Sequence, residues 1–447
     1  MEGLMRVTSL SGWGRYPVCG CRLATLRREE QLAQWAASST MIARGNGRSY
    51  GDAALNPELT LSMLAMDRLL DFDANQGIVS CEAGVLLADL LALCVPQGWF
   101  PPVVPGTAEV TVGGMIAADV HGKNHHRDGS FGNHVESLRL ATGNGDVLTC
   151  SREENADLFR ATIGGMGLTG VILSASFRMY RIESEHVRTE TLATPGLTAT
   201  MEMLETSDDW RYSVAWIDGS AKGGDLGRGL VSRGDFATAD EGSARAAHRS
   251  RDGGRRQLPI PALLSVALNP ASVRLFDALY NRVGRSQRRP RLVHHTSFFF
   301  PLDRVPGWNR LYGRRGFVQY QCVLPTSRSS QGLQAILERV EKSGHIAYLG
   351  VLKLLGEQGE GMMSFPMPGY TLALDFPMRR GTLELLDSLD EITAAHGGRV
   401  YLAKDARCRG DYVREGYPDL PLFGDVRQRS TTAKCEFSSA MSRRLGL

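Results

Sequence analysis

The sequence predicts an α+β protein of two domains, and three observations support this prediction. The chain has 447 residues, which is more than a single hydrophobic core usually holds. Residues 1–182 combine many glycines with short strand-like runs and brief helical segments. After Ile182 the composition changes, and strand-like segments resume between Phe298 and Phe376. Short strands mixed with separate helices are typical of an α+β fold.

Hydrophobic spacing predicts the elements of the first domain. Gly77 to Gly84 is expected to form a strand that ends in a turn, and Val85 to Cys94 carries leucines at helical spacing. Between Asn133 and Cys150, two alternating runs flank a Gly-Asn-Gly-Asp turn, which predicts a hairpin. A short helix is expected over Glu153 to Thr162 and a strand over Val171 to Met179.

The second half begins with a segment that has little to bury. Gly, Ser, Ala, Arg and Asp dominate Gly219 to Gln257, so we expect a mobile insertion there. An apolar run interrupted by prolines follows at Leu258 to Leu268, with five arginines shortly before it and five more in Arg282 to Arg291. Further on, Phe317 to Leu324 is expected to be a strand and Leu383 to His396 a helix.

Composition narrows the class of protein. An apolar content of 43%, a charged content of 22% and a net charge of +3 are those of an ordinary globular protein and give no indication of nucleic-acid binding. No run of 18 apolar residues predicts a transmembrane helix, and residues 1–15 lack the pattern of a secretory signal. The eight cysteines form no CxxC pair, which favours buried thiols. We therefore expect a cytoplasmic protein or one that is peripheral at the cell membrane.

The stretch Arg44 to Asp52 is the first candidate binding site. Three glycines in seven residues let consecutive backbone N–H groups point into one concavity, which two arginines and Ser49 surround. Such a nest suits a diphosphate, and in a protein of this size a diphosphate usually belongs to a nucleotide cofactor. The spacing matches neither a Rossmann turn nor a P-loop. The alternative is a polar surface loop.

Two later glycine clusters repeat this signal. Pro105-Gly106-Thr107 precedes Thr111-Val112-Gly113-Gly114, and Gly164 to Gly170 holds four more glycines. Glycine at these positions allows a flat ring or a phosphate to press against the backbone. A tight turn before a core helix is the alternative for the middle cluster.

The three clusters together resemble the FAD-binding domain of the vanillyl-alcohol oxidase superfamily, of the PCMH type. The sequence is more similar still to the decaprenylphosphoryl-β-D-ribose 2-oxidase family, and this resemblance runs along most of the chain. It is weakest over 219–291. Two matching strings are much more specific than the glycines: His121-Gly122-Lys123-Asn124-His125-His126 and Tyr401-Leu402-Ala403-Lys404-Asp405. Other matching stretches include Ser364-Phe365-Pro366-Met367-Pro368-Gly369-Tyr370 and Asp375-Phe376-Pro377.

The resemblance implies an FAD-binding domain made of 1–182 and a returning segment, 400–447, with an antiparallel substrate domain at 183–399. The residues expected to wrap the FAD pyrophosphate are Ala43, Arg44, Gly45, Asn46, Gly47, Arg48, Ser49, Tyr50, Gly51, Asp52 and Ala53. Those expected along the rest of the cofactor are Gly106, Thr111, Val112, Gly113, Gly114, His121, Gly122, Lys123, Asn124, Ile172 and Tyr401.

The flavin is expected to be dissociable. Many members of the superfamily link it to a histidine within the first loop, where this chain has Arg48. His121 is a conceivable attachment point, but the family that the chain resembles binds FAD non-covalently. We expect non-covalent FAD.

Lys404 and His121 are the candidate catalytic residues. Oxidation of a secondary alcohol removes the hydroxyl proton and transfers a hydride to the flavin. A buried lysine can stabilise the developing alkoxide or take the proton, and the sequence leaves both roles open. His121 is expected to act as a base or to contact the flavin; a structural histidine is the alternative. Gln319 and Gln321 suit sugar hydroxyls, and Lys353 and Lys404 complete the expected substrate site, with Lys353 suited to a phosphate.

No metal site is expected. The histidines form adjacent pairs, whose side chains diverge on a strand, and no acidic or thiol partner stands at ligand spacing; the pairs are His125 with His126 and His294 with His295.

The resemblance implies oxidation of the ribose 2-hydroxyl of a polyprenylphosphoryl-β-D-ribose to the 2-keto sugar. This would be the first half of an epimerisation to an arabinose donor for cell-wall or surface glycans, completed by a partner keto-reductase. A quinone or another acceptor would reoxidise the flavin. The apolar run 258–268 between arginines would attach weakly to a membrane; an internal loop is the alternative. Two other functions stay open: a soluble aldonolactone or alditol oxidase, and a flavin-binding protein without oxidase chemistry.

Overall fold

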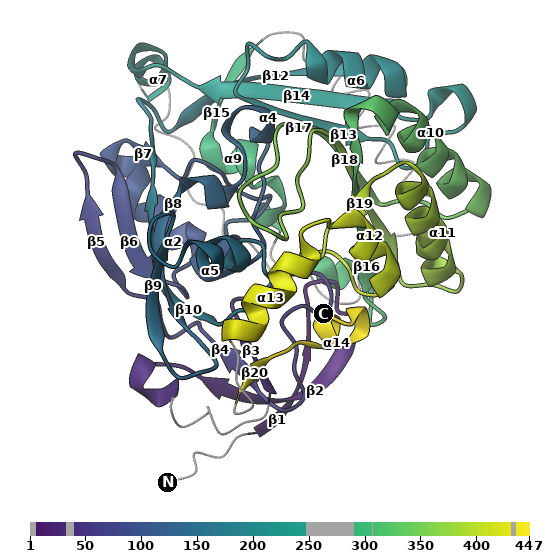
Figure 1. Cartoon of the computed structure of the whole chain (residues 1–447). Coiled ribbons are helices and arrows are strands. Elements are labelled where there is room, and N and C mark those ends of the chain that lie inside the picture. The colour runs from purple at the N-terminus through teal and green to yellow at the C-terminus, as the bar shows by residue number, and fades with distance from the viewer. Residues whose placement is uncertain (1–5, 33–39, 247–289, 306, 431–434) are drawn as a thin grey trace.

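The computed structural model describes most of the chain (Figure 1), namely residues 6–32, 40–246, 290–305, 307–430 and 435–447. Three main sheets organise these residues. The expected helices and strands outside residues 219–291 are confirmed, with bounds that differ by a few residues. The eight cysteines are all free. Among the described helices, none is long and apolar enough to cross a membrane.

The first sheet holds the two ends of the chain together. Its order is β1-β2-β4-β3-β20, with bounds β1 Arg6–Ser11, β2 Val18–Thr25, β4 Thr60–Ser62, β3 Thr40–Arg44 and β20 Glu436–Phe437. The C-terminal strand β20 pairs in parallel with β3, Phe437 opposite Met41. The loop that follows β3 is the predicted diphosphate loop, so the C-terminal segment lies beside the strand that carries it (Figure 1).

The second sheet is antiparallel and contains the predicted hairpin. Its order is β5-β6-β10-β8-β9, with bounds β5 Leu69–Asp73, β6 Ile78–Glu82, β10 Val171–Arg178, β8 Val135–Ala141 and β9 Val147–Ser151. A short pair, β7 (Trp99–Phe100) with β11 (Tyr180–Arg181), lies apart from it. Among the described residues, the helices of this part of the chain are α2 (Leu87–Cys94), α3 (Val112–Ala117), α4 (His125–Asp128) and α5 (Ala156–Thr162).

The third sheet is antiparallel and has eight strands. Its order is β15-β12-β14-β13-β17-β18-β16-β19, with bounds β15 Arg291–His294, β12 His186–Thr194, β14 Gly229–Phe236, β13 Tyr212–Ile217, β17 Leu349–Leu355, β18 Gly369–Pro377, β16 Phe317–Pro325 and β19 Arg399–Val400. The other helices that the structure describes are α6 (Leu197–Glu205), α7 (Ala239–Ala246), α9 (His295–Phe299), α10 (Thr326–Ser343), α11 (Thr382–Ala395), α12 (Gly410–Gly416), α13 (Leu420–Ser430) and α14 (Ala440–Leu445).

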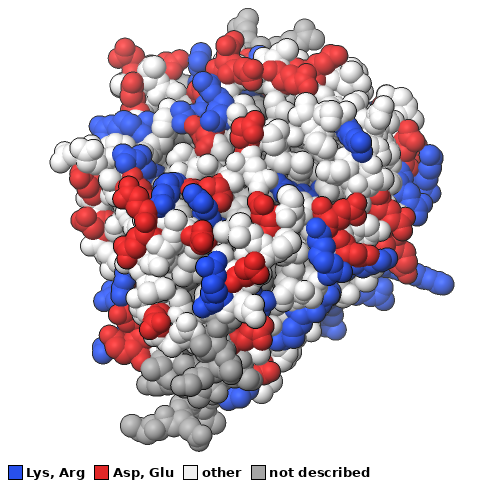
Figure 2. Space-filling view, in the orientation of Figure 1, with Lys and Arg blue, Asp and Glu red and all other residues white. Residues whose placement is uncertain are grey.

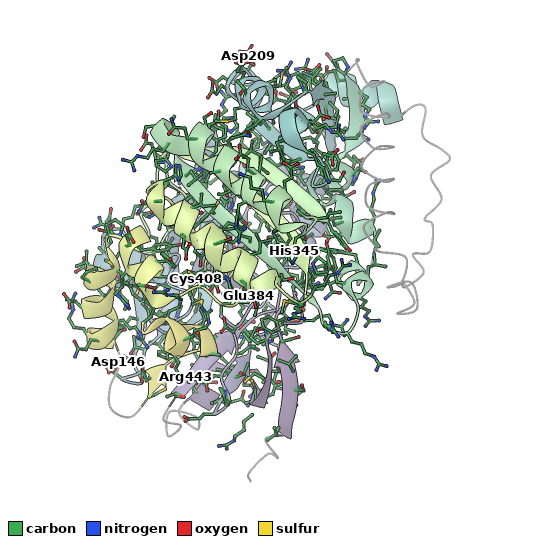
Figure 3. All side chains as sticks on the ribbon, turned by 90° about the vertical axis from the view of Figure 1, so that its right-hand side faces the viewer. Asp146, Asp209, His345, Glu384, Cys408 and Arg443 are labelled. Atoms are coloured by element: carbon green, nitrogen blue, oxygen red, sulfur yellow. The ribbon has the colours of Figure 1, made fainter. Side chains whose placement is uncertain are left out.

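Strand β16 is buried on both faces: one face packs against helices, and the other carries Gln319 and Gln321. Figure 3 shows α10, which ends near His345, and α11, which begins near Glu384, side by side over this sheet. The Tyr320 hydroxyl lies 2.7 Å from Thr393 Oγ1 of α11, so this residue points toward the helices. Gln319 and Gln321, one position away on either side, point to the opposite face because side chains alternate along a strand.

The predicted mobile insertion at Gly219 to Gln257 is wrong for two segments. Residues 239–246 form α7, and residues 229–236 form β14, which pairs with β12 on one side and β13 on the other. Leu230 and Val231 supply the buried side chains, and the small neighbouring residues fit between two strands. The prediction failed because hydrogen bonds to both neighbours stabilise a strand with few large side chains. Residues 247–257, the apolar run 258–268 and nearly all of the flanking arginines lie outside the described residues.

Candidate active site

A single cavity of about 1040 Å³ brings together most of the predicted site residues. It lies between the loop after β3, helix α3 and the face of the eight-stranded sheet that carries Gln319 and Gln321. The predicted cofactor residues that line it are Ala43, Gly45, Asn46, Gly47, Arg48, Ser49, Tyr50, Ala53, Gly106, Thr111, Gly113, Gly114, His121, Gly122, Lys123, Ile172 and Tyr401. The four predicted substrate residues line it as well: Gln319, Gln321, Lys353 and Lys404.

Five predicted cofactor residues lie behind the cavity wall. Arg44 donates to the Ser11 carbonyl oxygen at 2.8 Å, and Val112 is fully buried in the core. Asn124 donates to the Pro102 carbonyl oxygen at 2.8 Å. Gly51 packs against the backbone of Asp405, so a Cβ at position 51 would lie 1.8 Å from the Asp405 carbonyl oxygen. The fifth is Asp52, which accepts a hydrogen bond from Arg444 Nη2 at 2.9 Å.

The diphosphate loop is braced at its outer end by Glu109. Asn46 Nδ2 donates to the Glu109 carbonyl oxygen at 2.8 Å, and Arg48 forms an ion pair with the Glu109 carboxylate at 3.3 Å. The Arg48 guanidinium also stacks over Trp13, 4.2 Å from the ring centroid. Gly47 has φ +63°, the left-handed region that a concave turn of N–H groups requires.

The cavity fits a large flat cofactor with a diphosphate. Gly106 lies on its wall, and a Cβ there would meet nothing within 4 Å, so the absence of a side chain leaves room for a ligand. The wall between the loop and the sheet is apolar, with Ala117, Ala118 and Ile172. The Tyr401 hydroxyl donates to the Ala118 carbonyl oxygen at 2.8 Å and fixes the ring at the inner end of this wall.

Lys404 lies at the inner end of the cavity, joined to the diphosphate loop. The Tyr50 N–H donates to the Ala403 carbonyl oxygen at 2.9 Å, and Lys404 Nζ lies 3.9 Å from the Tyr50 ring centroid. Burial lowers the pKa of Lys404, and the nearby carboxyl of Asp375 acts in the opposite direction. Burial in turn raises the pKa of Asp375, which accepts a hydrogen bond from Gln319 Nε2.

Two further lysines face the same cavity. Burial, together with Lys404 and Lys123, lowers the pKa of Lys353 to about 7, and burial alone lowers that of Lys123 to about 7. Lys123 Nζ donates to the Phe298 carbonyl oxygen. Because like charges disfavour one another, this group of cations is ready to bind an anion.

His121 is held as a neutral imidazole. Burial lowers its pKa well below the ordinary value, and Lys353, His125 and Lys404 lower it further. Its Nε2 lies 2.9 Å from Gln321 Nε2, and the Gln321 amide also donates to Thr371 Oγ1. If the amide donates to Nε2, the proton resides on Nδ1, which has no partner among the described residues.

Sequence reasoning missed two residues that organise the site. Asp375 lies in a string that carries the resemblance, but a fully buried acid inside an apolar strand was itself a signal of function. Arg444, near the C-terminus, donates to Asp52 Oδ1 at 2.9 Å and to Asp405 Oδ2 at 2.8 Å. It therefore joins the diphosphate loop to the residue after Lys404, and no sequence pattern indicates such a contact.

Comparison with known proteins agrees with this geometry. Residues 29–151 match the model of an FAD-binding domain family. The chain is 37% identical to decaprenylphosphoryl-β-D-ribose oxidase of Mycolicibacterium smegmatis over 98% of its own length and 97% of that protein. The chain belongs to this oxidase family. The predicted resemblance, the α+β fold with its FAD-binding domain, and FAD as cofactor are thereby confirmed, and the chain is an FAD-dependent oxidoreductase.

Other relatives match a smaller share of this chain. An uncharacterized protein of Streptomyces coelicolor is 36% identical over 81% of this chain and 100% of its own length. L-gulonolactone oxidase of Bos taurus is 34% identical, but over only 30% of each chain. Among the described residues, no group of three His, Cys, Asp or Glu side chains is placed to hold a metal ion.

Proposed function

We propose that the chain oxidises the ribose 2-hydroxyl of a polyprenylphosphoryl-β-D-ribose to the 2-keto sugar. The observation that carries the proposal is the inner end of the cavity, where Lys404, two glutamines and Lys353 face one space continuous with the diphosphate loop. A near relative is named for a substrate of this class. The glutamines suit sugar hydroxyls and Lys353 suits the phosphate.

When bound, FAD supplies the two-electron acceptor for the hydride that leaves the ribose C2 carbon. The hydroxyl proton needs its own acceptor, and Lys404 Nζ is the group best placed to take it. Burial favours the neutral amine of Lys404, which can accept a proton, and Asp375 then lies close to the ammonium that forms. His121 contacts the flavin side of the cavity as a neutral ring and is the second candidate base.

The FAD is held non-covalently. The loop position at which a histidyl link forms in other superfamily members is Arg48, whose guanidinium cannot form that bond and is engaged by Glu109 and Trp13. A quinone or another acceptor reoxidises the flavin, and a separate keto-reductase converts the 2-keto sugar to the arabinose epimer. Because the substrate carries a polyprenyl chain, the enzyme works as a peripheral protein at a membrane surface.

Anaerobic reduction of the bound flavin tests the proposal. The purified protein should show flavin absorbance, release FAD on acid precipitation, and bleach when a polyprenylphosphoryl ribose is added. A soluble aldonolactone or alditol oxidase would bleach with a free polyol or lactone instead. If none of these compounds reduces the flavin although FAD is bound, the chain is a flavin-binding protein without oxidase chemistry.

A further inference from the structure

A cluster of exposed arginines surrounds one rim of the cavity. Arg310, Arg314 and Arg315 lie in and just after the turn Trp308–Tyr312, and Arg380 lies just after β18. The two segments are neighbours, because the Met378 N–H donates to the Gly316 carbonyl oxygen at 3.1 Å. We name these four arginines the basic rim. In the part of the chain that the structure describes, none of the four forms an ion pair, and all four side chains are exposed.

The basic rim is continuous with the cavity. Tyr312 and Tyr348 both line the cavity and stack on each other, with ring centroids 5.7 Å apart. Arg379, next to Arg380, donates to the Tyr348 hydroxyl at 2.6 Å. The same stretch of cavity wall ends in Val305, whose side chain is 37% exposed.

The basic rim differs in charge from other described parts of the surface. On the face seen in Figure 2, lysine and arginine alternate with aspartate and glutamate, and many arginines elsewhere have acidic partners. Two acids on adjoining segments have other partners: Asp303 accepts the Ala108 N–H at 2.7 Å, and Glu109 pairs with Arg48. The rim therefore presents net positive charge.

We infer that the basic rim docks the enzyme on an anionic lipid bilayer, with the cavity mouth facing the membrane. This inference rests on the proposed function, because a polyprenyl substrate keeps its tail in the bilayer while its phosphate and sugar reach the cavity. Exposed arginines beside an apolar side chain are the combination that binds an interface rich in anionic headgroups. Each basic residue near such a surface strengthens binding several-fold, so three together change the partition coefficient by roughly a hundredfold.

Vesicle flotation with the full chain and bound FAD tests the inference. Wild type should float with phosphatidylglycerol vesicles and not with phosphatidylcholine vesicles, and R310Q/R314Q/R315Q should bind the former roughly a hundredfold more weakly. The matched control R27Q/R160Q/R328Q removes three exposed arginines that do not line the cavity, and it should bind as wild type does. Equal binding of the two triple variants, or no preference of wild type for anionic vesicles, would overturn the inference.

The activity of the same variants separates this inference from the proposed function. With a short-chain, water-soluble prenylphosphoryl ribose, R310Q/R314Q/R315Q should reduce its flavin as fast as wild type does. With a long-chain substrate embedded in anionic vesicles, its reduction should slow in proportion to the lost binding. Failure of the wild type to reduce its flavin with either substrate would refute the proposed function and leave the vesicle result standing. An equal loss with both substrates would refute the docking role.

Discussion

Replacement of Lys404 by methionine tests the inner end of the cavity through both chemistry and stability. Methionine keeps the approximate length of the side chain but removes the amine, and with it the contact of Nζ with the Tyr50 ring. A positioned group that accepts a proton, or that stabilises an alkoxide, contributes about 10²–10⁴-fold to the rate, or about 3–5 kcal/mol in the barrier. We expect K404M to keep its FAD while flavin reduction by substrate slows by that factor.

The same variant leaves the buried carboxyl of Asp375 without its cation. The positive charge of Lys404 lowers the pKa of this carboxyl, so its loss destabilises the folded chain at every pH at which Asp375 is ionised. Burial raises the pKa of Asp375 above that of the unfolded chain, so at low pH the carboxyl in K404M is neutral and the cost is small. As the pH rises, the Asp375 carboxyl ionises at a lower pH in the unfolded chain than in the folded chain. The free energy of unfolding of K404M therefore falls further below that of wild type.

Two assays check this prediction. Stopped-flow bleaching under anaerobic conditions measures the chemical step, and urea unfolding at acid and alkaline pH measures the stability of wild type, K404M, D375N and K404M/D375N. The double variant should be more stable than K404M at alkaline pH, because no buried charge is left. A K404M variant that bleaches at the wild-type rate would refute the role of Lys404. A double variant no more stable than K404M would refute the electrostatic coupling of Lys404 and Asp375.

Three further predictions concern the loop, the anion site and the C-terminus. In G47A the new Cβ would lie 2.2 Å from the Arg44 guanidinium, at φ +63°, so we expect FAD to bind roughly tenfold more weakly, as measured by flavin fluorescence. The control G344A, at φ +74° in open space, should lower the free energy of unfolding by about 1 kcal/mol and leave FAD affinity unchanged. Equal FAD affinities of the two variants would contradict the role of the diphosphate loop in FAD binding. The pKa of Lys353 is lowered to about 7, so this lysine loses its charge as the pH rises through that value. The KM for the phosphate-bearing substrate should therefore be higher at pH values above about 7 than below. K353R stays charged and should flatten this rise, and a wild-type KM independent of pH would exclude Lys353 as the phosphate contact. R444M removes the guanidinium that pairs with the buried carboxylates of Asp52 and Asp405. We therefore expect the free energy of unfolding to fall by about 3–5 kcal/mol and FAD to dissociate faster. An unchanged FAD off-rate would show that Arg444 does not support the diphosphate loop.

Much of the fold and of the cavity could be predicted because the responsible signals are local. The hairpin at 135–151 depends on alternation and a turn, and helix α11 depends on spacing along one stretch of chain. The diphosphate loop is likewise visible from its glycines, because a left-handed residue such as Gly47 is needed wherever the backbone forms a nest. These features depend on residues close in sequence.

The parts that escaped prediction depend on contacts between distant residues. Strand β14 is stabilised by two neighbouring strands rather than by its own side chains. The Arg444 contact joins residues 392 positions apart, and only the folded chain shows that it supports Asp52. Asp375 gains its importance from the burial of Lys404 beside it, which no spacing along the sequence reveals.

The proposed reaction requires that a hydride leaves the ribose C2 carbon in this cavity. Anaerobic bleaching of the bound flavin by a polyprenylphosphoryl ribose, with hydrogen or deuterium at C2, measures that step directly. We expect that the substrate bleaches the flavin, that deuterium slows the bleaching by a primary isotope effect, and that the sugar product is the 2-ketone. Bleaching by a free polyol but not by the prenylphosphoryl ribose, or bleaching at the same rate with deuterium at C2, would contradict it.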